Sequence, residues 1–431
     1  MADTDDRLRL GGPQAPGAGD RTAADARPGP APAADARVAL GLAALALFVA
    51  AANLRPAIAA VSPLVDRIRT DLDLSATGVA LLTTVPTLAM GACAPLAASI
   101  GRRWGLQRGV LAGLFVVGLA TAVRGLGEAA WLQLCAAAVV GAGIAVAQTL
   151  LPAVVKTRFA ARAGLVTGIY TAGLGLGGAV AAGASAPLAQ ALGSWPGALA
   201  SWAVLAVIGI VMWTAARRSL GLEHVAGPKG PATSGLPWRS SLAWRITALS
   251  AANSALYYCE LAWIAPLLHD SGGVSEANAG VMLTVMISIQ VVAMLGVPAL
   301  LGERADKRTG LAATSVLTAI GFLGFAFSPG TGAWIWILAM GIGHGGLFTL
   351  VLTLPVSASR DAVQAGRFSA MAFFVGYGCA AVGPVLVGGL RDITGDYRLA
   401  FGLLAVITFL MLLPIARLSP RRIEQDQQKA L

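Results

Sequence analysis

Two charged residues lie inside apolar stretches that are long enough to cross a membrane, Arg55 and Glu260. A charge at such a depth costs roughly 2.5–3.5 kcal/mol on insertion scales, so it is usually functional. Arg55 keeps its charge and offers forked donors, which suit a carboxylate or another small planar anion. Pro56 follows it, lacks an N–H and disturbs the carbonyl of Ala52, so we expect a local break in the helix at this level.

Asn53 and Arg55 differ by about 200° around a helix, so they cannot both face the same cavity. We expect Arg55 to face a central cavity and Asn53 to face a neighbouring helix. The alternative for Arg55 is a purely structural role, in which it pairs with Glu260 or with backbone carbonyls.

Glu260 belongs to a polar and aromatic stripe on its helix. Asn253, Tyr257 and Glu260 follow one face, Trp263 is one turn further, and Tyr258 is expected on the opposite side. Burial disfavours a charged carboxylate and a nearby arginine favours it, so Glu260 is a candidate for proton coupling. A static ion pair and an uncoupled, pore-lining carboxylate are the alternatives.

Other polar and aromatic side chains also occur in the middle of apolar stretches. An isolated His or Gln there often forms only a helix–helix hydrogen bond. Gln290 is a weaker candidate of this kind. We predict a substrate-binding set of Arg55, Gln148, Tyr170, Tyr257, Trp263, His344, Phe373 and Tyr377, with Glu260 for proton coupling.

The elements that must position these residues are membrane helices. The chain has 431 residues, 56% hydrophobic and only 12% charged, whereas soluble proteins have about 25% charged residues. A span needs about 20 residues. The apolar stretches predict an all-α integral membrane protein with twelve spans, at 38–64, 77–100, 109–126, 131–155, 164–191, 198–216, 245–268, 277–300, 311–328, 333–356, 369–390 and 399–417.

The basic residues give this arrangement a direction. Of the 31 Lys and Arg residues, all but six fall on the side of the loops that also holds both termini. Apart from Arg55, the exceptions are Arg67, Arg69, Arg124, Arg391 and Arg398. By the positive-inside rule, both termini are expected in the cytoplasm of a bacterial cell, with the protein in its inner membrane. The net charge of +10 therefore does not indicate a nucleic-acid partner.

The spans divide into two six-helix bundles. Ala51-Ala52-Asn53 recurs as Ala251-Ala252-Asn253, and Gly141, Gly143 and Thr149 recur as Gly341, Gly343 and Thr349. Both recurrences have the same offset, which indicates a duplication, and repeated halves around a midplane site are a transporter design. We predict a disordered cytoplasmic tail (1–37), an N-terminal bundle (38–216), a cytoplasmic loop (217–244), a C-terminal bundle (245–417) and a cytoplasmic tail (418–431).

Motifs of other function classes are missing from the sequence. It has no GxxxxGK[ST] loop, no GxSxG elbow and no HExxH, and its four cysteines do not form paired metal spacings. We therefore expect no enzyme, no cofactor and no metal. The glycines inside spans, such as Gly173, Gly175, Gly177 and Gly178, indicate either contacts that slide during transport or static packing.

Several motifs resemble those of a known family, the major facilitator superfamily, and within it the cyanate and 2-nitroimidazole transporter branch. The resemblance covers about Val38 to Arg417. It is carried by Asn53-Leu54-Arg55-Pro56-Ala57-Ile58, Ser62-Pro63-Leu64, Leu81-Leu82-Thr83-Thr84-Val85-Pro86, Thr167-Gly168-Ile169-Tyr170-Thr171-Ala172, Gly345-Gly346-Leu347-Phe348 and Val375-Gly376-Tyr377. It implies the twelve-helix fold of that superfamily, with spans 1, 4, 7 and 10 around the cavity.

The chain also departs from this branch. Gln148, His344, Phe373-Phe374 and Glu260 stand where the branch usually has other residues. These changes suggest an aromatic-lined site for a ligand larger than cyanate.

The sequence thus predicts a monomeric secondary transporter of a small organic or weakly acidic solute. It would be coupled to protons, and its partners would be that solute, protons and membrane lipid. A multidrug or metabolite exporter with proton antiport is the alternative, and a non-transporting membrane receptor is the second alternative.

Overall fold

Long apolar stretches form helices because a helix satisfies its own backbone hydrogen bonds where lipid offers none. The computed structural model describes residues 31–73, 76–222, 235–302 and 306–419, and the regular elements in these ranges are all helices. Residues 39–431 form one compact unit.

The first half contains spans 1 to 6. Its elements are α1 (Ala31–Ala52), α2 (Pro56–Ala59), η1 (Ser62–Leu64), α3 (Val65–Asp71), α4 (Ala76–Val123), η2 (Arg124–Leu126), α5 (Ala130–Arg158), η3 (Ala160–Arg162), α6 (Ala163–Ala191), α7 (Trp195–Ser201), α8 (Ala203–Ala215) and α9 (Arg217–Leu220). The second half contains spans 7 to 12. Its elements are α10 (Ser241–Asp270), α11 (Glu276–Leu301), α12 (Lys307–Phe327), α13 (Ala333–Ser357), α14 (Ala362–Thr394), α15 (Arg398–Leu410) and α16 (Leu412–Ala416).

The expected twelve spans follow from these helices. Among the described residues, ten helical stretches are long and apolar enough to cross a membrane. One of them, Leu81–Leu126, holds two spans, because Gly105 interrupts α4 with a φ of 81° that only glycine adopts easily. Helix α10 is not among the ten, since Asn253, its tyrosines and Glu260 lower its hydropathy, but its 30 residues suffice to span.

The predicted domain boundaries can be compared with the described residues at the two ends of the chain and at the central connection. Helix α1 begins at Ala31, earlier than the expected start, although its apolar part begins at Val38 as expected. The predicted disorder of residues 1–30 and the predicted cytoplasmic tail at 420–431 lie outside the described residues. The predicted central loop (217–244) contains the short helix α9, and its last four residues belong to α10, which begins at Ser241. Between these helices, 221–222 and 235–240 are described.

The repeated glycines occupy matching places in the two halves. Gly141 of α5 packs on the backbone of Pro86 in span 2, and Gly143 packs on Gly113 in span 3. In the second half, Gly341 of α13 packs on Ile289 in span 8 and Gly343 packs on Thr318 in span 9. Span 4 therefore fits between spans 2 and 3 as span 10 fits between spans 8 and 9, which explains the repeated spacing.

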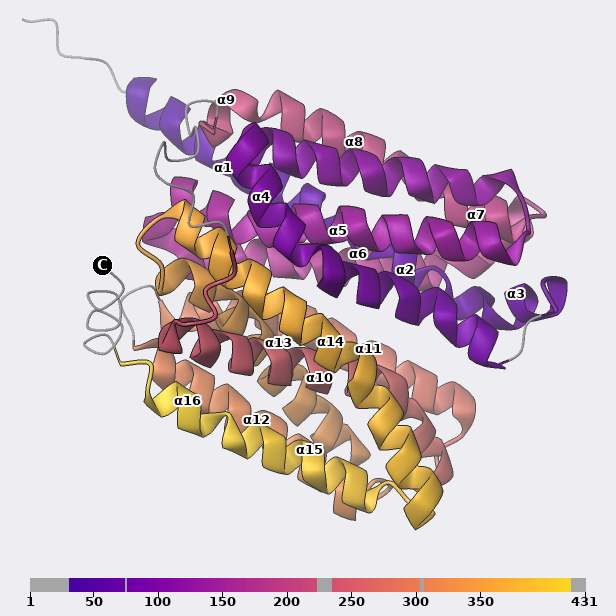
Figure 1. Cartoon of the computed structure of the whole chain (residues 1–431). Coiled ribbons are helices and arrows are strands. Elements are labelled where there is room, and N and C mark those ends of the chain that lie inside the picture. The colour runs from indigo at the N-terminus through magenta and orange to yellow at the C-terminus, as the bar shows by residue number, and fades with distance from the viewer. Residues whose placement is uncertain (1–30, 74–75, 223–234, 303–305, 420–431) are drawn as a thin grey trace, which may run out of the picture. The chain divides into compact units, whose positions relative to one another are not determined.

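The two halves meet chiefly through two helix pairs. Helix α4 packs against α14, and α6 packs against α11. Figure 1 shows α14 beside α4, where the purple and orange ribbons meet. Gly91 of α4 lies so close to α14 that an added Cβ would be 3.2 Å from the Tyr377 Cβ. The side chains at the centre of this contact, described below, come from both halves.

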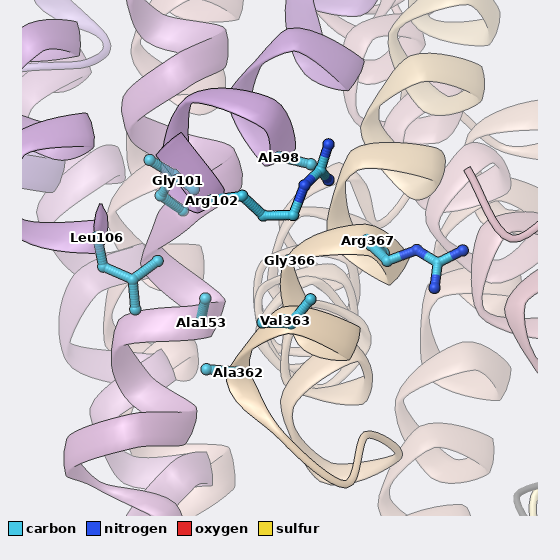
Figure 2. Close-up of a pocket in the computed structure, with 10 residues that line it drawn as sticks. Ala98, Gly101, Arg102, Leu106, Ala153, Ala362, Val363, Gly366 and Arg367 are labelled. Atoms are coloured by element: carbon cyan, nitrogen blue, oxygen red, sulfur yellow. The ribbon is translucent and has the colours of Figure 1, made fainter. Parts of the chain in front are cut away.

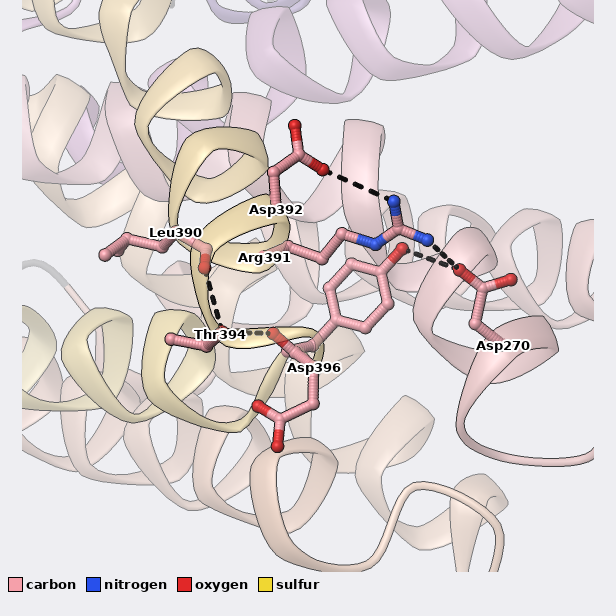
Figure 3. Close-up of polar contacts among 7 residues, drawn as sticks. Asp270, Leu390, Arg391, Asp392, Thr394 and Asp396 are labelled. Atoms are coloured by element: carbon pink, nitrogen blue, oxygen red, sulfur yellow. Dashed lines mark hydrogen bonds and ion pairs between the residues drawn. The ribbon is translucent and has the colours of Figure 1, made fainter.

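The two ends of the helices differ in charge. We call the end that carries loops 101–108, 156–163 and 357–361 the basic end. At the opposite end, a clamp within the second half joins α10 to α14 and α15 (Figure 3). Asp270 accepts hydrogen bonds from Arg391 Nη2 at 3.2 Å and from the Tyr397 hydroxyl at 2.9 Å. Burial, and then this hydrogen bond to Asp270, raises the pKa of Tyr397.

Candidate functional site

The first span is broken where the sequence predicts it. Helix α1 ends at Ala52, and α2 starts at Pro56. Between them the backbone forms a turn in which the Leu54 amide donates to the Ala51 carbonyl at 2.9 Å. Pro56 has no N–H to continue the ladder, so the chain restarts its helix there and projects Arg55 from the break.

A buried arginine at the end of span 3, Arg124, contacts the segment after this break. Arg124 is 1% exposed, and its Nη1 donates to the Ala57 carbonyl at 2.6 Å. Its own carbonyl accepts a 2.9 Å hydrogen bond from Gln133 Nε2. The sequence predicts Arg124 at the end of the span 109–126, on the side opposite the termini, but it does not predict that the side chain is buried in the first half. Its bond to α2 fixes the segment that carries Arg55.

Arg55 reaches across to the second half. Its Nη1 donates to the Tyr258 hydroxyl at 3.0 Å, and its guanidinium carbon lies 5.7 Å from the centre of the Tyr257 ring. Within the described part of the chain Arg55 forms no ion pair. Its charge is therefore held by a hydroxyl and by a ring face, both of which an anionic ligand can supplement.

Asn53 faces the other way, as expected. It packs on Gly209 of α8, where an added Cβ would be 2.5 Å from its Nδ2, and its amide donates to the Val49 carbonyl at 2.8 Å. The expectation for Tyr258 was wrong, because this side chain lies on the side of Arg55. Adjacent residues differ by 100° around a helix, and a long tyrosine at the edge of the Tyr257 face still reaches the interface.

Glu260 does not pair with Arg55. Its Oε1 accepts a 2.6 Å hydrogen bond from Gln290 Nε2 of α11, and its Oε2 lies 2.6 Å from His344 Nδ1 of α13. Glu260 is 0% exposed and His344 is 1% exposed. The carboxyl group is thus held inside the second half by two neighbouring spans, and an ion pair with the first half is excluded in this arrangement.

His344 has one ring nitrogen left over. Its Nε2 is buried and has no hydrogen-bond partner among the described residues. The ring lies edge-on to Tyr257, with centroids 6.1 Å apart. Tyr257 therefore contacts both Arg55 and His344, and it separates the cation of the first half from the buried pair of the second half.

A second group of predicted residues joins α5 to α14. Gln148 Nε2 donates to the Tyr377 hydroxyl at 2.7 Å, and the Tyr377 ring stacks on Phe373 at 5.6 Å. Tyr170 of α6 is buried in the same apolar cluster. The Tyr170 hydroxyl and Gln148 Oε1 have no hydrogen-bond partner within the described ranges. Buried polar atoms without a protein partner can form a hydrogen bond with a ligand or with an ordered water molecule.

Trp263 does not lie with these residues. Its Nε1 donates to the Pro384 carbonyl at 2.8 Å, and its ring lies 5.9 Å from that of Tyr397. It is therefore packed inside the second half towards the opposite end, and its expected place in the substrate wall is not supported. Trp263 is one helical turn from Glu260 in the sequence, but its long side chain packs against α14.

The glycines of α6 have divided roles. Gly173 packs on Phe48 and Gly177 on Ala52, within the first half, so these two provide static packing that brings α1 close. Gly168 and Gly175 face Met294 and Val291 of α11, between the halves. Of these two pairs, only Gly168 and Gly175 have contacts that would change if the halves moved relative to each other.

Comparison with known proteins places this geometry in a family. A model described as Major Facilitator Superfamily matches residues 39–383. The chain is 32% identical to the 2-nitroimidazole transporter of Escherichia coli (strain K12) over 85% of this chain and 92% of that protein. It is 29% identical to the cyanate transport protein CynX of the same organism, over 88% of this chain and 98% of that protein.

Solved structures agree on the fold. The proton:xylose symporter XylE aligns with a TM-score of 0.73 and 14% identity over 89% of this chain and 96% of its own. The human organic anion transporter MFSD10 aligns with a TM-score of 0.68 and 15% identity over 87% of this chain and 99% of its own.

Proposed function

The chain belongs to the Major Facilitator Superfamily, and on this premise we propose that it is a secondary active transporter of a small, weakly acidic organic solute that works by alternating access. One observation carries the proposal. Arg55 stands in a helix break at the contact between the halves, and a hydroxyl and an aromatic ring are its partners. A half-buried cation with such partners can accept an anion.

The surroundings of Arg55 favour a solute with a flat apolar body. Tyr257 packs on Phe348 at 5.4 Å, and Phe373 stacks on Tyr377. Gln148, Tyr170 and His344 each present a buried polar atom without a partner among the described residues. Such a site would hold the charged end of the solute on Arg55 and its body between rings. Nitroimidazoles, which the relative's name suggests, have this shape.

We propose proton coupling through the pair of Glu260 and His344. The 2.6 Å contact allows a proton to lie on either partner, and Gln290 keeps the carboxyl in place. A solute anion on Arg55 would favour a positive charge on the nearby pair, so binding of the solute and of the proton would support each other. The basic end would face the cytoplasm, following the positive-inside rule.

The function is tested by transport into proteoliposomes of known orientation, with 2-nitroimidazole and aromatic carboxylates as solutes. Wild-type protein should accumulate one of these classes, and accumulation should depend on a pH gradient. Arg55→Ala should insert normally and transport nothing measurable. Transport by Arg55→Ala at the wild-type rate would show that the assignment is wrong. Extrusion driven by the same gradient would identify the exporter.

A further inference from the structure

A hydrogen bond between two threonines joins the halves outside the residues assigned to the solute site. Thr171 Oγ1 of α6 lies 2.8 Å from Thr349 Oγ1 of α13, and both residues are fully buried. Thr171 Oγ1 also donates to the Gly168 carbonyl at 3.1 Å. Because a hydroxyl group has a single proton, Thr349 is the donor in the contact between the halves and Thr171 is the acceptor.

The threonine pair lies between the solute site and the basic end. On α6, Gly178 marks the level of the solute site, because a Cβ added there would be 3.4 Å from the Arg55 Cβ. Thr171 precedes Gly178 by seven residues and is nearer to the start of α6 at the basic end. Seven residues correspond to about 10 Å along a helix. The contact of Thr171 with Thr349 therefore closes the α6 side of the way from Arg55 to the basic end.

On the α14 side of the interface, the halves approach each other through small residues that leave a pocket (Figure 2). Helices α4 and α5 of the first half and α14 of the second half form its walls. Figure 2 shows Gly101 and Ala153 of the first half on one side, with Val363 and Gly366 of α14 on the other. A Cβ added at Gly366 would lie 3.9 Å from the Ala153 Cβ. A methyl group at Gly366 can therefore add a contact between the halves without a clash.

Separation of the halves at the basic end changes what surrounds the two threonines. While the halves are in contact, a buried hydroxyl group that has lost its partner is unsatisfied, which is costly. Once the halves separate, water reaches Thr171 and Thr349 and can satisfy either hydroxyl group. Removal of one hydroxyl group therefore raises the free energy of the arrangement in contact more than that of the separated arrangement.

We propose that the hydrogen bond from Thr349 to Thr171 is a latch that holds the halves together at the basic end and sets how often this end opens. The inference rests on the proposed alternating access, but it does not depend on the identity of the solute or on proton coupling. The two hydroxyl groups are not equivalent. Loss of the Thr171 hydroxyl leaves the Thr349 proton without this acceptor, whereas Thr171 keeps its bond to Gly168 when the Thr349 hydroxyl is lost.

The test measures the distance between two spin labels by double electron–electron resonance, on the full chain in lipid nanodiscs and without solute. The labels are attached at Ala160→Cys and Ser357→Cys, two exposed positions at the basic end of the two halves, after the four native cysteines are replaced by alanine. Thr171→Val should raise the ratio of longer to shorter distances about fivefold, as expected for one buried hydrogen bond. Thr349→Val should raise this ratio less. The double variant should also raise it less than Thr171→Val does, because no hydroxyl group of the pair is left without its partner.

Two glycine variants of α14 provide a change in the opposite direction and its control. Gly366→Ala should lower the ratio about threefold, since the added methyl group is buried against Ala153 only while the halves are in contact. Gly389→Ala makes the same change where a Cβ would meet nothing within 4 Å, and it should leave the ratio unchanged. A longer distance that Thr171→Val does not enrich would overturn the latch and leave alternating access in place. A single short distance in every variant would overturn the latch and contradict alternating access as well.

Discussion

The two halves share a scaffold and differ in the chemistry that they place at its centre. In the first half, the charged group is Arg55, which stands in a helix break and reaches across the interface to Tyr258. In the second half, the charged group is Glu260, which stays inside its own bundle with Gln290 and His344. One group is therefore presented to a ligand, and the other is withheld from it.

This difference suggests a division of labour. The cation that faces the interface can bind a solute, whereas the enclosed carboxyl group can exchange only a proton. Tyr257 contacts both, through its ring face to Arg55 and edge-on to His344. A change of charge at Arg55 therefore acts electrostatically on the pair of Glu260 and His344, and the reverse, because the low dielectric of the interior screens charges weakly.

The largest expected effect concerns the cation itself. Arg55→Ala should lower solute affinity about 10- to 100-fold, since hydrogen bonds to a charged group contribute about 1.5–3 kcal/mol. Binding is measured by solute-dependent thermal shift of the purified protein. Arg55→Lys, which keeps the charge but not the fork, should fall between Arg55→Ala and wild type. Equal affinities for all three proteins would remove Arg55 from the solute site.

The next effect concerns the support of the break. Arg124→Leu should destabilise the first half by about 1–3 kcal/mol, because the Ala57 carbonyl is left buried without its donor. It should also weaken solute binding, because the segment of Arg55 loosens. The control is Arg69→Leu, an exposed arginine at the same end, which should do neither. Denaturant unfolding measures the stability, and the thermal shift measures solute binding. An unchanged stability of Arg124→Leu would contradict the role of the hydrogen bond from Arg124 to Ala57.

A smaller effect separates the two tyrosines at Arg55. Tyr258→Phe removes the hydroxyl that accepts from Arg55 and should raise the KM about fivefold, as expected for one net hydrogen bond of about 1 kcal/mol. Tyr257→Phe keeps the ring beneath the guanidinium and should stay within about twofold of wild type. The reverse order of the two KM values would mean that the roles have been exchanged.

The smallest effect is expected at the clamp of Asp270 with Arg391 and Tyr397, which lies within the second half and takes no part in solute or proton binding. Tyr397→Phe loses one hydrogen bond to Asp270 and should cost about 1 kcal/mol of stability. The raised pKa of Tyr397 means that its contribution is complete below the ordinary tyrosine value of about 10 and is lost only above it. The difference in melting temperature should therefore be constant from pH 5 to pH 8, and a difference that varies there would show that the clamp titrates.

The sequence predicted the features that depend on local rules. The length of the apolar stretches predicted the spans. Pro56 predicted the break, because proline lacks a backbone N–H and crowds the preceding turn. The repeated glycines predicted the two halves, because close helix packing requires a small residue at the same place in each copy. Asn53 was placed correctly by its helical angle alone.

The features that depend on partners could not be predicted. Arg55 and Tyr258 are 203 residues apart, and a helical wheel does not say which side chain of another bundle stands opposite. His344 and Gln290 were singled out separately, and the sequence did not predict that both contact Glu260. Arg124 lies at the end of the predicted span 109–126, and only the tertiary structure shows that it is buried against α2.

The central claim is that the enclosed carboxyl group of Glu260 carries the proton and that Arg55, the cation at the contact between the halves, binds the solute. Glu260→Gln tests it most directly, because the amide keeps the shape but cannot ionise, and its one oxygen can still accept the hydrogen bond from Gln290 while its NH2 group takes the place of the oxygen that faces His344. In proteoliposomes, this variant should still exchange labelled for unlabelled solute, at a rate within about threefold of wild type, and should no longer accumulate solute when a pH gradient is applied. Gradient-driven accumulation by Glu260→Gln at the wild-type level would contradict the account.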